Sequence, residues 1–313
     1  MSRMPNDLTN DVGGPVQTPA ETAFADALAA AVARTRSIAC VGLDPRVNQL
    51  PPAIRDRFAE DAAAVEAFCR GVIDAVAGKV PVVKPQSAFF EALGPAGAMV
   101  LSRVIHHARS AGLLVIVDAK RNDIGSTAAA YAAAYLGRSA PFAGDALTVS
   151  PYLGRDSIEP FCEVCDLQNA GLFVLVKTSN PGGGLFQNRI TDGQPLHDAV
   201  ADLIEQFNAS RIGRCGYGPV GSVVGATYPQ QLAELRTRLK HSWILIPGYG
   251  AQGGGADDVR PGVDANGLGA IVNSSRHIIF AYHREEYRDR WAPADWQNAV
   301  AAATDDMNQQ LQF

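Results

Sequence analysis

Short apolar runs that alternate with amphipathic or Ala-rich segments are the feature that most constrains the fold of this 313-residue chain. The runs are rich in β-branched residues, which is typical of parallel strands buried on both faces. Eight of them can be traced, at residues 37–41, 80–86, 113–117, 145–149, 172–176, 218–227, 243–246 and 269–272. Strands that alternate with helices predict a parallel sheet, and eight of them predict an α/β fold of the (β/α)8 or TIM barrel type in a single domain.

The segments between the runs are expected to form helices, at about 20–36, 58–77, 96–110, 128–134, 156–168, 196–212 and 229–240, with closing helices around Tyr282 to Trp296. A doubly wound sheet is the alternative, but no G-x-G-x-x-G sequence follows the first apolar run. We expect the barrel domain to span residues 21–313 and residues 1–20, which contain Pro5, Pro15 and Pro19, to form a flexible tail.

Charge and composition argue against several classes of partner. The formal net charge is -5 and there is no run rich in Lys and Arg, which disfavours a nucleic-acid surface. No apolar stretch approaches the ~18 residues of a transmembrane helix, and residues 1–20 lack the pattern of a signal peptide. Five scattered cysteines suit a reducing compartment. We therefore expect a cytoplasmic protein with neither a membrane nor a nucleic-acid partner.

Two of the cysteines, Cys162 and Cys165, form a C-x-x-C sequence within a predicted helix. Such a pair can be half of a zinc site, but no second pair and no nearby histidine ligands complete one. The alternative, that both thiols face the core of the protein, fits the helical spacing better. We predict no metal site here.

The third apolar run leads directly into Asp118-Ala-Lys120-Arg-Asn-Asp123. Residues two apart at the end of a strand share a face, so Asp118 and Lys120 are expected to point the same way. Asp123 follows near the start of the next helix. Two carboxylates that flank a lysine suggest catalysis, although a solvated ion pair and a helix N-cap would explain the same residues.

Charged residues also follow the first two apolar runs. Asp44 comes after the first run and Lys84 ends the second, and each taken alone could be an ordinary turn or edge residue. In a barrel, however, both would lie at the carboxyl ends of the strands together with Asp118 and Lys120. That end of the barrel is where such enzymes place their chemistry, so the combined pattern favours an active site.

Three segments near the carboxyl ends of later strands indicate a ligand. Residues 180–195 are long and rich in Gly and Pro, which predicts a mobile loop that acts as an active-site lid. Residues 247–255 are Gly-rich and follow the seventh run, and Arg276 follows the eighth. Glycines allow backbone N–H groups to approach an anion, and Arg binds phosphate through two hydrogen bonds. These segments predict a phosphate site.

The sequence Asp-Ala-Lys-Arg-Asn-Asp-Ile-Gly-Ser-Thr, residues 118–127, resembles the signature of the orotidine 5'-phosphate decarboxylase family. Further similar motifs follow in the family's order from Gly42 to Arg276, and they resemble its longer bacterial branch, often called type 2. The resemblance implies conversion of orotidine 5'-monophosphate to UMP and CO₂, the last step of de novo UMP synthesis. It also implies that neither a metal nor an organic cofactor is required.

The resemblance assigns roles to the charged residues. Lys120 matches the proton donor to C6 of the pyrimidine, and Asp118 matches the carboxylate beside the leaving carboxylate of the substrate. Lys84 and Asp44 match residues that bind the ribose and extend an alternating network of charges.

The remaining matches concern the substrate's other groups and the neighbouring subunit. Asp123 and Thr127 match residues that reach the ribose region of the neighbouring site, which implies a homodimer. Ser179 matches the serine that hydrogen-bonds the pyrimidine. Gln252 and Arg276 match phosphate contacts, with Gln252 also near the base.

Two positions depart from the type 2 pattern. Asn122 and His277 stand where glycine is usual, and His277 could either crowd the phosphate or donate a hydrogen bond to it. Two other functions stay open at this stage. One is a metal-dependent phosphosugar enzyme of the hexulose-phosphate synthase kind, and the other is a nucleotide-binding regulator without catalytic activity.

Overall fold

A computed structural model of the chain describes residues 23–250 and 254–312. The predicted flexible tail at residues 1–20 and the predicted phosphate ligand Gln252 lie outside these residues.

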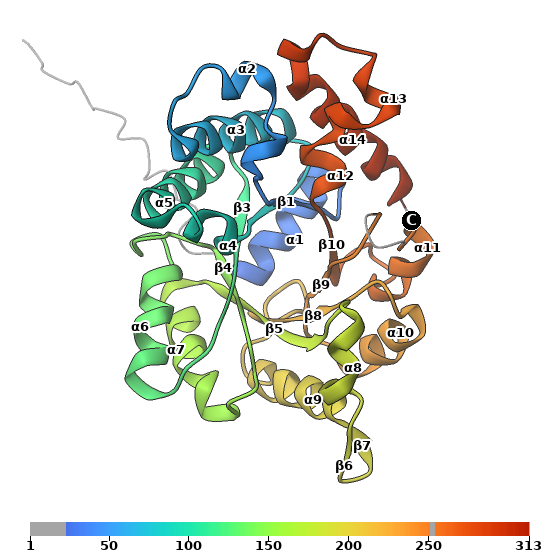
Figure 1. The fold of residues 1–313 in the computed structure, drawn as a ribbon. Coiled ribbons are helices and arrows are strands. Elements are labelled where there is room, and N and C mark those ends of the chain that lie inside the picture. Colours follow the sequence, from blue (N-terminus) through green and yellow to red (C-terminus); the bar gives the residue numbers. More distant parts are fainter. Residues whose placement is uncertain (1–22, 251–253, 313) are drawn as a thin grey trace, which may run out of the picture.

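Eight parallel strands close into a barrel in the order β1-β10-β9-β8-β5-β4-β3-β2 (Figure 1). They are β1 (Ala39–Leu43), β2 (Val82–Pro85), β3 (Leu114–Arg121), β4 (Ala146–Val149), β5 (Gly171–Lys177), β8 (Val220–Val224), β9 (Ile244–Ile246) and β10 (Ala270–Ser274). Nearly every residue of these strands is buried, because side chains fill the barrel on one face and helices cover the other. The predicted (β/α)8 barrel is confirmed.

The helices surround the barrel with their apolar faces turned inward. The longer ones are α1 (Phe24–Thr35), α3 (Asp61–Val76), α5 (Gly94–Ser110), α6 (Gly125–Tyr135), α7 (Glu159–Gln168), α9 (Leu196–Asn208), α10 (Pro229–Arg238) and α14 (Trp296–Gln310). Short helices are α2 (Pro52–Arg55), α4 (Ser87–Glu91), α8 (Gly184–Gln187), α11 (Ala256–Val259), α12 (Arg276–Ile279) and α13 (Glu285–Arg288). The expected helices are present, with ends that differ by a few residues.

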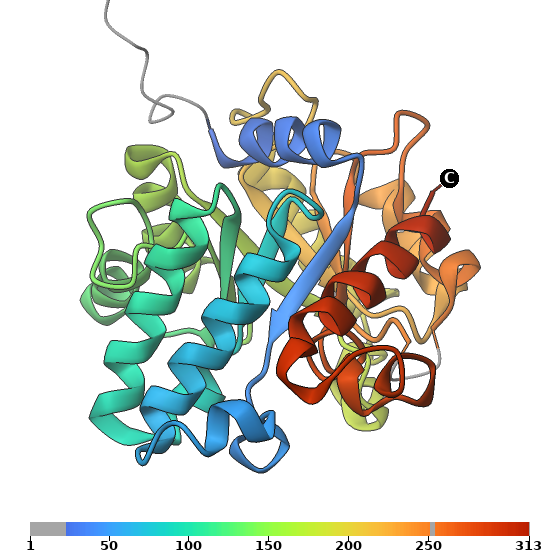
Figure 2. The ribbon, with the colours of Figure 1, turned by 90° about the horizontal axis from the view of Figure 1, so that it is seen from above.

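Helix α1 crosses the end of the barrel at which the strands begin (Figure 2). The ring of Phe24 meets the ring of Phe173 edge to face, with centroids 6.0 Å apart. Gly171, the first residue of β5, leaves room for Phe24, because a Cβ atom there would lie 2.2 Å from the ring. The helix therefore closes this end, and the opposite end remains for ligands.

Strand β3 is longer than the apolar run predicts. The run ends at Val117, but the strand continues to Arg121 and includes Asp118 and Lys120. Its pairing with β4 shifts register between Val117 and Arg121, so that Arg121 lies opposite Val149. The cause is tertiary: pairing with β4, and not the local sequence, extends the strand.

The C-x-x-C pair belongs to the core, as predicted. Cys162 and Cys165 lie on α7, and both thiols are free and buried. Burial raises the pKa of Cys162 to about 12, so the thiol stays protonated and behaves as a small apolar group.

The predicted lid at residues 180–195 has regular structure of its own. It contains a single 3₁₀ turn (Pro181–Gly183), helix α8, and a small hairpin of β6 (Ile190–Thr191) and β7 (Gln194–Pro195). The hairpin projects from the body of the protein beside α8 and α9 (Figure 1). Among the described residues, no helix is long and apolar enough to cross a membrane.

Candidate active site

Three charged side chains form a continuous chain at the carboxyl end of the barrel. Lys84 from β2 and Lys120 from β3 both contact Asp118, with Nζ to carboxylate-oxygen distances of 2.6 Å each. Asp118 and Lys84 are buried, whereas the Lys120 side chain is 46% exposed. The expectation that Asp118 and Lys120 point the same way is confirmed, and Lys120 is the member of the set that a ligand can reach.

The two lysines keep Asp118 ionised. Burial alone would raise its pKa, but the charges and hydrogen bonds of Lys84 and Lys120 hold it well below its ordinary value. Burial would likewise lower the pKa of Lys84, and the carboxylates of Asp118 and Asp44 more than reverse this. The site therefore keeps a full negative charge between two ammonium groups at neutral pH.

Thr148 on β4 holds this arrangement in place. Its Oγ1 donates to Asp118 Oδ1 at 3.0 Å and accepts from the backbone N–H of Lys120 at 2.9 Å. Lys120 needs such support because its φ of +48° lies in the left-handed region, which is strained for a residue with a side chain. Sequence reasoning missed Thr148, and a polar residue within an apolar strand run was the available signal.

Two buried side-chain oxygens at the ends of β1 and β10 have no hydrogen-bond partner among the described residues. One carboxylate oxygen of Asp44 and the side-chain oxygen of Asn273 are buried, and neither accepts a hydrogen bond from the described residues. The two strand ends lie close together, since Ser275 Oγ donates to the Gly42 carbonyl at 3.0 Å. Buried oxygens of this kind usually find a donor, so they suit ligand hydroxyl groups. Sequence reasoning predicted Asp44 and missed Asn273.

Asp123 and Thr127 do not join the charged chain within one subunit. Asp123 accepts a hydrogen bond from the backbone N–H of Ile124 at 2.8 Å, and it forms no ion pair with Lys120 among the described residues. Thr127 lies on the first turn of α6 and is exposed. The expected grouping of Asp118, Lys120 and Asp123 is therefore only partly present in the single chain.

The Gly-rich segment and Arg276, which the sequence predicts to bind phosphate, follow the neighbouring strands β9 and β10. Gly248 and Gly250 have φ values of +99° and +71°, which favour glycine. Arg276 is the first residue of α12, and its side chain is exposed. The structure describes this segment at residues 247–250 and 254–255, and the phosphate site stays a prediction.

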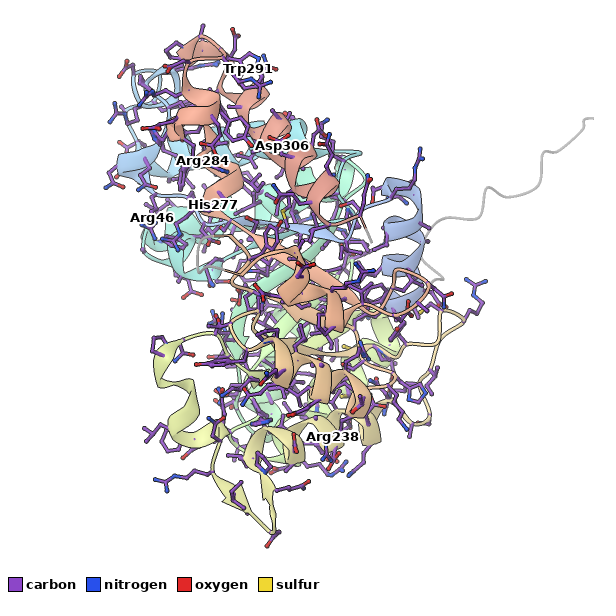
Figure 3. All side chains as sticks on the ribbon, turned by 90° about the vertical axis from the view of Figure 1, so that its right-hand side faces the viewer. Arg46, Arg238, His277, Arg284, Trp291 and Asp306 are labelled. Carbon is purple, nitrogen blue, oxygen red and sulfur yellow. The ribbon has the colours of Figure 1, made fainter. Side chains whose placement is uncertain are left out.

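His277 packs beneath the Gly-rich segment. A Cβ atom at Gly250 would lie 2.6 Å from the imidazole Nδ1, so the ring fills the space that glycine leaves. It lines a cavity of about 310 Å³ together with Arg284 and Asp306 (Figure 3). Burial, followed by the charges of Arg284 and Arg276, lowers the pKa of His277. The imidazole is consequently neutral at pH 7.

The lid begins directly after β5. Ser179, the predicted pyrimidine contact, lies two residues beyond the strand and packs closely on Gly225, where a Cβ atom would come within 2.8 Å of the serine Cβ. Strand β5 follows β4 around the barrel. Ser179 therefore lies on the same rim as the charged chain.

A closed barrel that gathers charged side chains at the carboxyl ends of its strands defines a TIM-barrel enzyme. Comparison with known proteins narrows this class. The model of the family "Orotidine 5'-phosphate decarboxylase / HUMPS" matches residues 39–289. The chain belongs to this family.

Individual relatives agree with the family match. An orotidine 5'-phosphate decarboxylase of Rhodopirellula baltica is 61% identical over 297 residues, which cover 92% of this chain and 98% of the relative. One of Caldicellulosiruptor bescii is 39% identical over 85% of this chain and 92% of its own. The solved structure of Leishmania donovani OMP decarboxylase has a TM-score of 0.69 and 33% identity, and covers 91% of this chain and 99% of that one.

Proposed function

We propose that this protein decarboxylates orotidine 5'-monophosphate to UMP and CO₂ in pyrimidine biosynthesis. The observation that carries the proposal is the chain of alternating charges Lys84–Asp118–Lys120 at the mouth of the barrel. Membership of the family and the names of its relatives support the same reaction. No other function of the family is favoured by a feature of this site.

Loss of CO₂ leaves a carbanion at C6 of the pyrimidine, and the enzyme must stabilise the charge where it develops. Repulsion between Asp118 and the substrate carboxylate supplies about 4 kcal/mol at roughly 4 Å with an effective dielectric constant of about 20. The largest enzymatic accelerations need on the order of 20 kcal/mol. Repulsion in the ground state is thus a minor contribution.

Lys120 provides the larger contribution in this proposal. Its ammonium is held by Asp118 at 2.6 Å and is partly exposed, so a bound pyrimidine can approach it. As the bond between C6 and the carboxylate carbon breaks, the ammonium stabilises the electron pair left on C6. Lys120 then transfers a proton from Nζ to C6 and recovers one from solvent.

The other predicted residues bind the rest of the substrate. Asp44 and Lys84 are proposed to bind ribose hydroxyl groups, one of which would donate a hydrogen bond to the buried Asp44 oxygen that lacks a partner among the described residues. Ser179 is proposed to hydrogen-bond the pyrimidine. Gln252 and Arg276 are proposed to bind the phosphate, whose binding energy would draw the lid over the site and exclude water.

We also propose that the enzyme works as a homodimer in which Asp123 and Thr127 reach the partner's site. Asp123 forms no ion pair with Lys120 among the described residues, and Thr127 is exposed. Three exposed apolar side chains lie on the loops that follow the neighbouring strands β3 and β4: Ile124 is 55% exposed, Tyr152 76% and Leu153 45%. Exposed apolar residues that lie together commonly mark an interface.

We further propose that the enzyme belongs to the cytoplasm. The five free cysteines of the protein fit that reducing compartment.

The test is the fall of the ultraviolet orotate band when orotidine 5'-monophosphate is mixed with purified protein and EDTA. We expect UMP to form with EDTA present. Lys120→Ala should lower kcat by at least about a thousandfold, because both charge stabilisation and the proton donor are lost. Lys240→Ala is the matched control, since Lys240 is exposed and lies before β9, at the opposite end of the barrel.

Other outcomes would contradict the proposal. Near-normal turnover by Lys120→Ala would remove Lys120 from its role. Turnover only after Mg²⁺ is added would favour the phosphosugar branch of the family. Tight binding of UMP without release of CO₂ would favour a regulator.

A further inference from the structure

Lys177 is a buried cation that the proposed mechanism does not use. It is the last residue of β5, and only 1% of its surface is exposed. Lys84 and Lys120 each pair with Asp118, but Lys177 forms no ion pair with a carboxylate among the described residues. Burial lowers the pKa of Lys177, as expected for an ammonium without an opposite charge.

The ammonium joins three segments that are distant in sequence. Nζ donates a hydrogen bond to Asn188 Oδ1 at 2.7 Å, and Asn188 belongs to the lid. Nζ also lies 5.0 Å from the centre of the Tyr228 ring, which follows β8. The pairing of β5 with β8 shifts register between Leu175 and Lys177, and such an irregularity changes the direction of a side chain. Lys177 thereby connects β5, the lid and the segment after β8.

Neighbouring bonds hold the same part of the lid. The Gln187 side chain accepts from the Thr178 N–H at 3.1 Å and donates to Thr178 Oγ1 at 2.8 Å. The Gln187 carbonyl bonds His197 Nδ1 at 2.7 Å. These contacts join residues 177 and 178, which precede Ser179 in the chain, to residues 187 and 188, which follow it.

A structural role alone does not explain a lysine at this place. Removal of an ammonium from water is unfavourable, and one amide oxygen and one aromatic ring offset only part of that cost. An apolar side chain of the same length would pack at less cost. The only hydrogen bond that the ammonium donates in the described part of the chain goes to Asn188 in the lid.

We propose that Lys177 is a positioning residue that anchors the lid to the end of β5 and thereby fixes Ser179 against the pyrimidine. The anchor itself stands on the contacts above. Its effect on the pyrimidine rests on the function proposed for Ser179, so the two parts need separate measurements.

Cleavage by trypsin measures the anchor without any substrate. Arg189 is exposed in the lid, next to Asn188, whereas Arg214 is exposed outside it and serves as an internal reference. In Lys177→Met, which keeps an apolar chain under Tyr228, we expect cleavage after Arg189 to be about tenfold faster, from the loss of a hydrogen bond to a charged group. Asn188→Ala should behave alike, and the double variant should be no faster than either. Mass spectrometry identifies the two cleavage sites.

Steady-state kinetics measure the effect on the site. We expect both variants to raise KM for orotidine 5'-monophosphate about tenfold while kcat changes less than about twofold, because Lys120 and Asp118 are untouched. Lys240→Met is the control for removal of a lysine. Unchanged cleavage after Arg189 in both variants would overturn the anchor. Faster cleavage with unchanged KM would overturn the link to Ser179, and a protein that releases no CO₂ would contradict the proposed function while leaving the trypsin result valid.

Discussion

At the scale of single residues, Asp118 is the centre of the charged chain in the barrel. It is buried, accepts hydrogen bonds from Lys84, Lys120 and Thr148, and has a pKa well below its ordinary value. A buried carboxylate between two ammonium groups is costly to disturb, because removal of one partner leaves the others buried and uncompensated.

This arrangement makes stability depend on pH. Since the pKa of Asp118 is lowered in the folded protein, its contribution is fully present above the unfolded value of about 3.9 and is lost as pH falls below it. Asp118→Asn should lower the free energy of unfolding by about 3 kcal/mol at pH 7, where it leaves Lys84 buried beside a neutral amide. The difference from wild type should stay constant from pH 7 to about pH 5 and shrink as pH falls below about 4, as measured by urea unfolding over that range.

Asp145 provides a control of opposite sign. Burial raises its pKa in spite of Arg109, so its ionisation opposes folding and its protonation at low pH favours the folded state. Asn at this position cannot take up a proton, so the stability of Asp145→Asn relative to wild type should decrease as pH falls.

For Asp118, free energies of unfolding that change with pH in parallel for wild type and Asp118→Asn would contradict its role in the pH dependence.

At the scale of elements, the barrel depends on close approaches that the pattern of apolar residues does not reveal. Helix α1 sits against the first residue of β5 because Gly171 has no side chain. The sequence predicted both elements, but their contact depends on how the helix crosses the end of the barrel. Likewise, the predicted lid contains a helix and a hairpin whose positions are held by Lys177, Thr178 and His197.

We expect Gly171→Ala to lower the free energy of unfolding by about 2 kcal/mol, because the new methyl group would displace the Phe24 ring and lift α1 from the barrel. Gly182→Ala is the matched control: a Cβ atom there would meet its nearest neighbour at 3.6 Å, and the residue is exposed. Urea unfolding of both variants measures the effect. Equal stability of the two would show that the ring moves aside without cost.

At the scale of the whole molecule, the single chain presents an incomplete version of the predicted site. Lys84, Asp118 and Lys120 are assembled within it, whereas Asp123 is not paired with them and Thr127 is exposed. A two-fold dimer would complete the site, because each subunit then lends these residues to the other.

Mixing two inactive variants tests this arrangement. Asp118→Ala and Asp123→Ala, combined in equal amounts with subunit exchange, should recover about one quarter of wild-type activity, since half the dimers are hybrids with one intact site each. Asp118→Ala mixed with Lys120→Ala is the control and should recover none, because both residues serve the same subunit's site. If exchange is demonstrated and the first mixture stays inactive, Asp123 acts in its own subunit.

The sequence by itself determined the barrel and most of the charged set. Apolar runs of strand length are dictated by burial on both faces, and charged residues at their ends are visible without coordinates because a parallel barrel brings all those ends to one rim. Only the tertiary structure decided which residues contact and support the charged set and the lid. Thr148 beneath Lys120, Asn273 beside β1 and Lys177 beneath the lid are ordinary residues in the sequence. They become significant through contacts between strands and loops that lie far apart along the chain, and such contacts leave no local pattern.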